Sequence, residues 1–155
     1  MSEQHSSQQL KLEEFFPYKL TKLQDAISKD LAKVYKEYKL SRQQWRILAI
    51  LGDTDKTPNS QELSAKKLGE LTNLDKMQTS RAIAKLKEAK LVSTDEDQND
   101  KRSILVKLTD KGIELRRELE PKVLAHEKRL LSALTARQYE QFCTMMEKLL
   151  RQAER

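Results

Sequence analysis

Cysteine, glycine and histidine are all scarce in this chain of 155 residues. A single cysteine excludes a disulfide framework and a cysteine-rich zinc site. The three glycines do not form a loop that could cradle phosphate groups. The two histidines, His5 and His126, lie far apart, and no spacing brings together a nucleophile, a base and an orienting group. These absences argue against an enzyme, and they suggest no metal site and no cofactor.

Long apolar runs are also missing. No stretch approaches the roughly 20 apolar residues that a membrane-spanning helix needs. The polar start, residues 1–9, has neither the cationic segment nor the apolar run of a signal peptide. We therefore expect a soluble, cytoplasmic protein. Its length is that of one domain with a sizeable core.

Aromatic residues make up only 5% of the chain, and six of the eight precede residue 46. The other two, Tyr139 and Phe142, lie near the C-terminus. The central segment therefore offers no rings for stacking bases, which is how single-stranded nucleic acid is usually bound. The net charge of +6 favours a polyanionic partner. Double-stranded DNA suits a basic segment that lacks aromatic platforms.

The most informative segment is residues 75–90. Asp75 followed by Gln78 is a capping-box pattern, which predicts that a helix begins here. Helical spacing assigns four residues to its inward face: Thr79, Ala82, Ile83 and Leu86. Residues 76–90 carry five cations against one anion, a local charge of +4. These features favour a DNA-recognition helix, and the alternative is an ordinary solvated amphipathic helix.

The flanking segments complete a DNA-binding motif. Residues 64–71 are predicted to form a short helix, followed by a turn at residues 72–73. After the recognition helix come two predicted strands with a charged loop between them: residues 91–94 and residues 102–108, in which Ile104, Val106 and Leu108 alternate as in a half-buried strand. This order predicts a winged helix-turn-helix, a mainly α fold with a small β-hairpin wing.

These segments resemble the MarR (multiple antibiotic resistance regulator) family. The similar stretches are residues 44–48 in a preceding helix, 63–68 and 74–81 in the helix-turn-helix, and 97–102 and 106–112 in and after the wing. The resemblance runs from about residue 15 to the C-terminus. The sequence departs from the family in two places: residues 52–62 are longer and more polar than usual, and Gln98 stands where proline is common.

Amphipathic helices are predicted on both sides of this motif. Residues 15–38 have apolar positions three and four apart, with Pro17 in the first turn. Ser41 caps a helix that reaches Leu51. Two capping threonines begin the C-terminal helices: Thr109, whose helix runs to about Leu131 with a kink at Pro121, and Thr135 with Gln138 in a capping box.

One chain offers little to cover the apolar faces of these outer helices, so we expect a homodimer. A symmetric dimer would place its recognition helices about 34 Å apart on a pseudo-palindromic operator, as the resemblance also implies. The expected organisation has three parts: a flexible tail (1–14), a helical dimerisation region (15–40 and 110–155) and a winged helix-turn-helix domain (41–109).

DNA contacts are expected from the recognition helix and the wing. Glutamine suits adenine and arginine suits guanine in the major groove, which favours Gln78 and Arg81 as base readers. Met77 could touch thymine methyl groups, while phosphates are assigned to Lys76, Ser80, Lys85 and Lys101. The resemblance implies that Arg102 enters the minor groove and that Asp100 pairs with it and fixes its direction. The alternative is an ordinary charged turn.

The resemblance also implies a small-molecule effector. Family members commonly bind phenolic or other aromatic acids between the dimerisation helices and the DNA-binding domain, and a buried carboxylate favours an arginine partner. The candidate ligand-binding residues are Tyr18, Ser28, Tyr38, Trp45 and Arg46. In the alternative, Trp45 belongs to the core and Arg46 pairs with an acid such as Glu37.

Two functions follow for the chain as a whole. The first is a ligand-responsive transcriptional repressor, a homodimer that binds its operator and is released by a small aromatic or phenolic acid. The second is a winged-helix protein-interaction module that does not bind DNA. Binding to duplex DNA that weakens steeply with salt would distinguish them, because phosphate contacts release counterions.

Overall fold

The computed structural model describes residues 9–52 and 62–155 and confirms the predicted fold class. A short 3-10 helix, Leu12–Glu14, precedes the first long helix. In chain order, the α-helices and strands are α1 (Phe16–Lys36), α2 (Arg42–Leu51), β1 (Leu63–Ser64), α3 (Ala65–Thr72), α4 (Lys76–Glu88), β2 (Val92–Glu96), β3 (Ile104–Leu108), α5 (Asp110–Leu131) and α6 (Ala136–Ala153). Most of the predicted loop after Gly52, and most of the predicted tail, lie outside the described residues.

Side-chain caps fix the starts of α2, α4, α5 and α6, as predicted. Reciprocal capping boxes open α2 (Ser41 with Gln44), α4 (Asp75 with Gln78) and α6 (Thr135 with Gln138). Thr109 caps α5, which continues as one helix through Pro121. α1 ends at Lys36, two residues before its predicted end, and Lys39 then adopts a left-handed φ of 57°.

The wing is part of a three-stranded antiparallel sheet in the order β1-β3-β2. β2 and β3 form the predicted hairpin, with Val92 opposite Leu108. β1 was not predicted; it places Leu63 opposite Val106 and so adds an edge strand to the hairpin. Val106 and Leu108 are buried, but Ile104, at the start of β3, is exposed. The predicted alternation therefore holds only for the end of the strand nearest the core.

α2 lies at the centre of the core. Its side chains Ile47, Leu48 and Leu51 are fully buried, and α2 contacts α1, α3, α4, α5 and β3. Burying an aliphatic side chain of this size contributes about 1.5–3 kcal/mol. The same core includes Leu86 of α4 and Leu119 of α5. α2 therefore joins the helix-turn-helix to the long outer helices through one packed core.

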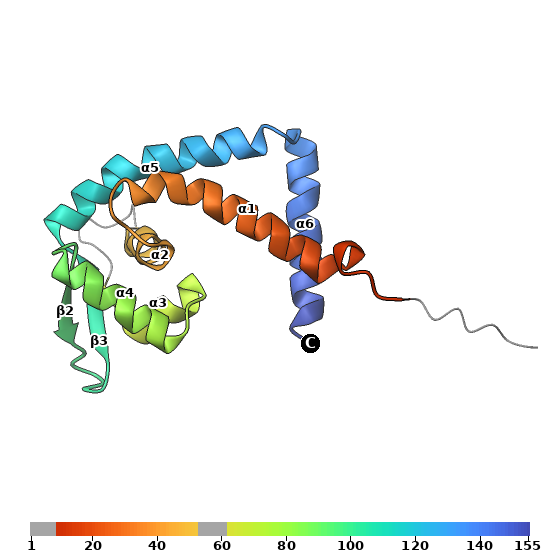
Figure 1. The fold of residues 1–155 in the computed structure, drawn as a ribbon. Helices are drawn as coiled ribbons and strands as arrows, with labels where there is room; N and C mark the ends of the chain where they lie inside the picture. The colour runs from red at the N-terminus through yellow and green to blue at the C-terminus, as the bar shows by residue number, and fades with distance from the viewer. Residues whose placement is uncertain (1–8, 53–61) are drawn as a thin grey trace, which may run out of the picture.

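The long helices α1 and α5 pack against each other, and α6 lies at the end of the molecule away from the β2–β3 hairpin (Figure 1). None of the 18 residues of α6 is buried. Large apolar side chains are exposed on α1, α5 and α6: Phe16, Leu20, Leu23, Leu124, Leu130, Tyr139, Met145, Met146, Leu149 and Leu150. Among the described residues, no helix is long and apolar enough to cross a membrane.

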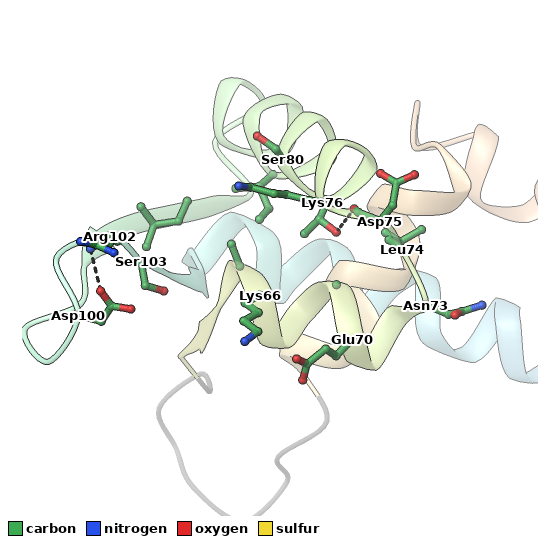
Figure 2. Close-up of a pocket in the computed structure, with 15 residues that line it drawn as sticks. Lys66, Glu70, Asn73, Leu74, Asp75, Lys76, Ser80, Asp100, Arg102 and Ser103 are labelled. Atoms are coloured by element: carbon green, nitrogen blue, oxygen red, sulfur yellow. Dashed lines mark hydrogen bonds between the residues drawn. The ribbon is translucent and has the colours of Figure 1, made fainter. Parts of the chain in front are cut away.

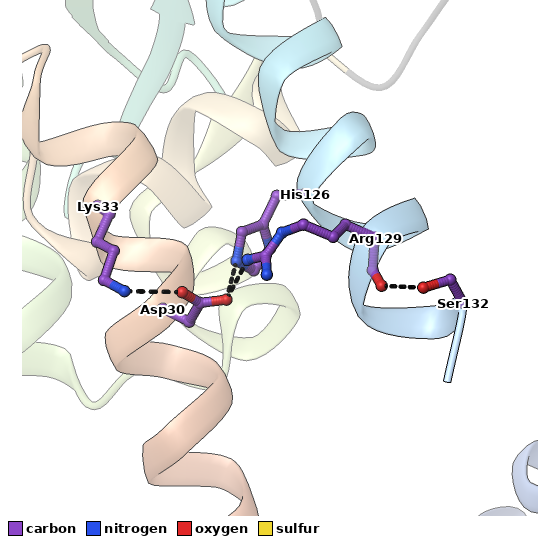
Figure 3. A network of polar contacts seen from close by, with 5 residues as sticks. All are labelled: Asp30, Lys33, His126, Arg129 and Ser132. Carbon is purple, nitrogen blue, oxygen red and sulfur yellow. Dashed lines mark hydrogen bonds and ion pairs between the residues drawn. The ribbon is translucent and has the colours of Figure 1, made fainter. Parts of the chain in front are cut away.

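A polar cluster fastens α1 to α5 at Asp30 (Figure 3). One carboxylate oxygen accepts from Lys33 Nζ at 3.0 Å, and the other lies 2.7 Å from His126 Nε2 and 2.5 Å from Arg129 Nη2. The His126 side chain in this cluster is only 8% exposed. Hydrogen bonds from Lys33, His126 and Arg129 hold the pKa of Asp30 far below its ordinary range.

This depressed pKa predicts how the stability of the fold depends on pH. The ionised Asp30 stabilises the fold at every pH above the ordinary carboxyl value of about 3.9, and this contribution is lost as the pH falls below that value. Asp30→Asn should therefore lower the melting temperature at neutral pH, and the gap to wild type should close from about pH 4 downward. Thermal denaturation followed by circular dichroism across this range measures the effect.

Asp25→Asn is the matched control, because Asp25 lies on the same helix, is exposed and its side chain makes no hydrogen bond or ion pair among the described residues. It should leave the melting temperature almost unchanged. Equal effects of the two substitutions at neutral pH would mean that the Asp30 cluster does not hold α1 against α5.

Candidate nucleic-acid interface

The turn between α3 and α4 sets the angle at which α4 leaves the core. Asn73 adopts a left-handed φ of 55°, and the Leu74 N–H donates to the Gly69 carbonyl at 2.9 Å. Gly69 lies where the two helices meet: a Cβ atom there would stand 2.9 Å from the Thr79 hydroxyl oxygen. Glycine thus permits a close approach of α3 to α4, which the sequence alone did not indicate.

α4 has one buried and one exposed face, as its sequence predicted. Thr79, Ala82, Ile83 and Leu86 are buried. The candidate base and phosphate contacts on this helix are all exposed: Lys76, Met77, Gln78, Ser80, Arg81 and Lys85. Met77, the large apolar side chain among them, is 62% exposed. The helix therefore presents a continuous polar and basic face with one apolar side chain.

Gln78 is only partly free to make new contacts. Its Oε1 atom accepts from the Asp75 backbone N–H at 3.2 Å, while its own N–H donates to Asp75 Oδ1 at 2.8 Å. A glutamine that reads adenine uses its amide oxygen and its NH₂ group together. With the oxygen engaged in the capping box, Gln78 offers only its NH₂ donors. Reading adenine with both groups would require Gln78 to give up the cap.

A groove of about 1040 Å³ lies between α3, the N-terminal half of α4 and the wing (Figure 2). Its lining includes Lys66 of α3, Lys76 and Ser80 of α4, and Arg102 and Ser103 of the wing. Sequence reasoning missed Lys66 and Ser103. The only sequence signal for Lys66 is its place in a lysine pair at the start of a helix, and the fold alone shows that this helix faces the wing.

The groove also contains three carboxylates, but each has a partner of its own. Asp75 accepts from the backbone of α4, and Asp100 Oδ1 accepts from the Arg102 N–H at 3.0 Å. Glu70 lies 3.7 Å from Lys67. Lys66, Lys76 and Arg102 form no ion pair with the other described side chains. The cations are therefore available to an external anion, whereas the carboxylates are already engaged.

Backbone hydrogen bonds shape the tip of the wing. The Asp97 side chain accepts from the Asn99 N–H at 2.9 Å, and the Ser103 N–H donates to the Asp100 carbonyl at 2.9 Å. Asp100 thus contacts the backbone of Arg102 and not its guanidinium group, which differs from the predicted side-chain pair (Figure 2). This is the geometry of the alternative, a turn residue. Lys101 and Arg102 are exposed beside it.

The candidate ligand-binding residues do not form one cluster in this chain. Tyr18 lies near the start of α1, and Tyr38 lies just beyond its end. The rise per residue of an α-helix places the two tyrosines about 30 Å from each other. The Tyr38 hydroxyl donates to Glu118 at 3.0 Å, and Lys122 lies 4.9 Å from the centre of its ring. Ser28 is half-buried midway along α1. A pocket that combines Tyr18 with Tyr38 is therefore impossible within one protomer.

Trp45 and Arg46 both contact the core region. Trp45 is half-buried and packs against the core, as the alternative interpretation expected. Arg46 donates to the carbonyl of Thr72, the last residue of α3, at 3.2 Å. The acid named in that interpretation, Glu37, instead lies 4.0 Å from Lys122. Arg46 thus caps the end of α3, and only some of its N–H groups are engaged.

Tyr35 of α1 and Arg42 of α2 lie in the same region as Arg46. Tyr35 is only 3% exposed, and burial raises the pKa of its hydroxyl, while the nearby Arg42 and Arg46 act in the opposite direction. Sequence reasoning treated residue 35 only as part of a helix. The signal that could have found the group is the pair of arginines four residues apart on α2, which lie on one helical face.

Comparisons with known proteins agree with this geometry. A family model described as a winged helix DNA-binding domain matches residues 40–112. No curated protein matches the chain. A MarR family transcriptional regulator from Silicibacter pomeroyi is similar in structure over 90% of each chain, with 27% identity and a TM-score of 0.71.

Two other solved structures share the fold at lower identity. BpsR from Bordetella bronchiseptica, whose DNA binding is regulated by 6-hydroxynicotinic acid, has 20% identity and a TM-score of 0.79, covering 91% of this chain and 96% of its own. PcaV from Streptomyces coelicolor, in complex with its natural ligand, has 21% identity and a TM-score of 0.77, covering 94% and 98%. Residues 40–112 thus form a winged helix DNA-binding domain, and the chain is similar over most of its length to MarR family transcriptional regulators.

Proposed function

We propose that this protein is a ligand-responsive repressor that binds a pseudo-palindromic operator as a homodimer and is released by a small aromatic or phenolic acid. The observation that carries the proposal is the exposed basic face of α4 beside the groove and the wing. Its cations have no partner carboxylates among the described residues, so a phosphate backbone can take that place.

The contacts with DNA divide into two kinds. Lys76, Ser80, Lys85 and Lys101 hold phosphates, and Lys66 is added to this set because it lines the same groove. Arg81 reads guanine, and Met77 touches a thymine methyl group. Gln78 donates its NH₂ group to acceptors on base edges while its oxygen keeps the cap. Arg102 enters the minor groove, held by a turn that Asp100 stabilises.

The proposed partner for the outer helices is a second copy of the chain. α6 has no buried residue and a long apolar face, and the N-terminal half of α1 also exposes leucines and Phe16. Apolar surface of this extent on a single chain favours an interface. We therefore assign residues 15–40 and 110–155 to dimerisation and residues 41–109 to DNA binding. A two-fold axis then sets the spacing of the two α4 helices.

The proposed effector site lies where α1 meets α2. Arg46 and Arg42 approach the buried Tyr35 there, and Trp45, on the same helix as the two arginines, packs against the core. A planar carboxylate can take two parallel N–H groups of an arginine. The regulation of BpsR by 6-hydroxynicotinic acid supports an effector of this kind, and the complex of PcaV with its natural ligand supports a ligand site in this fold. Tyr18 and Ser28 remain candidates at a second contact along α1.

The proposed function can be tested by selecting duplexes from a random-sequence pool and titrating the best sequence by fluorescence anisotropy. We expect one dimer to bind each palindromic duplex, with an affinity that falls steeply as salt rises. Failure of the folded protein to enrich any duplex would reject the DNA-binding function and favour the protein-interaction module.

Arg81→Ala should weaken binding to the selected operator by about 1–3 kcal/mol and relax the preference at one base pair. The reason is the loss of two hydrogen bonds to a base edge, which random DNA does not provide. Anisotropy titrations on operator and scrambled duplexes measure the effect. Lys87→Ala, an exposed cation in the last turn of the same helix, is the control for charge. Equal losses on both duplexes would reduce Arg81 to a positioning contact.

A second prediction concerns Asp100. Because its carboxylate accepts from the backbone N–H of Arg102, Asp100→Asn should keep nearly full operator affinity, since an amide oxygen can accept the same bond. Asp100→Ala should weaken binding by about 1 kcal/mol, and Arg102→Ala by more. Operator titrations of the three variants decide this. If Asp100→Asn binds as poorly as Asp100→Ala, the carboxylate acts through its charge on the guanidinium group.

A third prediction concerns the effector. Affinity for 6-hydroxynicotinic acid or benzoate, measured by calorimetry, should fall at least tenfold in Arg46→Ala, because a bidentate pair contributes more than about 1.4 kcal/mol. Arg46→Lys separates this effect from the lost contact with Thr72, because a lysine can still donate to that carbonyl. By linkage, the operator must weaken acid binding by the factor by which the acid weakens operator binding.

Two results would count against this site. Undiminished binding of the acid by Arg46→Ala would remove Arg46 from it. Affinity for the acid that is the same with and without operator would end the proposed induction mechanism, even if the acid binds.

A further inference from the structure

The three residues that follow α4, Ala89, Lys90 and Leu91, are hydrogen-bonded through their carbonyls to the start of α5. The Ala89 carbonyl accepts from Lys111 Nζ at 3.1 Å. The Lys90 carbonyl accepts from the Thr109 hydroxyl at 2.7 Å, and the Leu91 carbonyl accepts from the Thr109 backbone N–H at 3.1 Å. These carbonyls lie beyond the end of α4 at Glu88. Here residues about 20 positions later in the chain supply all three donors.

The segment after α4 and the start of α5 also approach each other very closely. A Cβ atom on Gly112 would stand 2.1 Å from the Leu91 carbonyl oxygen, so only glycine permits this approach. The Thr109 hydroxyl also accepts from the Gly112 N–H at 3.1 Å and thereby caps α5. Lys90 reaches this position through a left-handed φ of 60°. The Thr109 hydroxyl therefore bonds to the segment that follows α4 and also caps the start of α5.

We propose that this α4–α5 joint, formed by residues 89–91 and 109–112, transmits the orientation of α5 to the recognition helix, and that Lys111 is a positioning residue for operator binding. The inference rests on the proposed function and adds the route by which its two ends communicate. Lys111 does not touch the operator in this proposal; it acts through the Ala89 carbonyl.

α5 connects the α4–α5 joint to α1. Further along α5, His126 and Arg129 contact Asp30 of α1, so α5 is fastened to α1 at one place and to α4 at another. A change in the packing of α1 against α5 is thus carried to α4 by a continuous helix. Lys111 is the part of the joint that can be tested separately, because it is exposed and its removal leaves no cavity.

The decisive variant is Lys111→Met, with Lys111→Arg as the conservative variant and Lys128→Met as the control. Lys128 lies on the same helix, is exposed, and its side chain makes no hydrogen bond or ion pair among the described residues, so its substitution removes the same charge without touching the joint. Amide hydrogen exchange reports on Ala89 and Lys90, whose N–H groups bond back into α4. Titrations on operator and scrambled duplexes at several salt concentrations report on DNA.

For Lys111→Met we expect faster exchange at Ala89 and Lys90 and a roughly five- to tenfold loss of affinity for the operator but not for the scrambled duplex. The slope of affinity against salt should stay unchanged, and the melting temperature should move by no more than about 2 °C. Lys111→Arg should restore both exchange and affinity, and Lys128→Met should behave as wild type.

Three outcomes overturn the inference. A salt slope reduced by about one, with equal losses on both duplexes, would show that Lys111 holds a phosphate itself. Unchanged exchange and unchanged affinity would show that the joint does not need Lys111. A wild type that binds no duplex would reject the proposed function together with the positioning role. The exchange data would still report whether Lys111 holds the end of α4.

Discussion

The burial of α2 is the constraint on which the other elements depend. Its side chains Ile47, Leu48 and Leu51 are fully buried, and the helix contacts both the winged helix-turn-helix and the long helices α1 and α5. Arg46, on the same helix, adds a polar tether to the end of α3. Because packed interiors rearrange between discrete states rather than deform smoothly, the helix-turn-helix cannot drift independently of α1 and α5. A ligand placed beside α2 therefore acts on the whole assembly.

Stability and recognition compete for the same atoms at the start of α4. The Asp75–Gln78 capping box is worth about 1 kcal/mol, and a bidentate contact between glutamine and adenine contributes about 1–3 kcal/mol. Gln78 cannot gain the second without losing part of the first, so its net discrimination is small. Arg81 is exposed and has no partner among the described side chains, so it can contact a base without breaking an existing hydrogen bond. Specificity should therefore depend more on Arg81.

The features that sequence predicted correctly are local ones. Capping boxes such as that of Thr135 and Gln138, and the buried stripe of α4, depend on residues three or four apart, and that spacing is fixed by helical geometry. The features it missed join distant segments: β1 pairs with β3, Asp30 meets His126, and Lys66 faces the wing. Asp100 shows a subtler limit, since the pair of residues was foreseen but the atom it contacts was not. Such choices depend on backbone geometry that residue types do not encode.

The dimensions of α5 explain how a small effector could control DNA binding. From the cluster at Asp30 to the first turn of α5 is roughly 25 Å, from the rise of an α-helix. A tilt of about 5° around that cluster would move the start of α5 by about 2 Å. Base contacts tolerate displacements of only about 0.5 Å. A tilt that small is within reach of one aromatic ring entering between α1 and α2. In the proposed two-fold dimer the tilt would displace both recognition helices symmetrically, so the distance between the two α4 helices would change by up to twice the displacement of one helix.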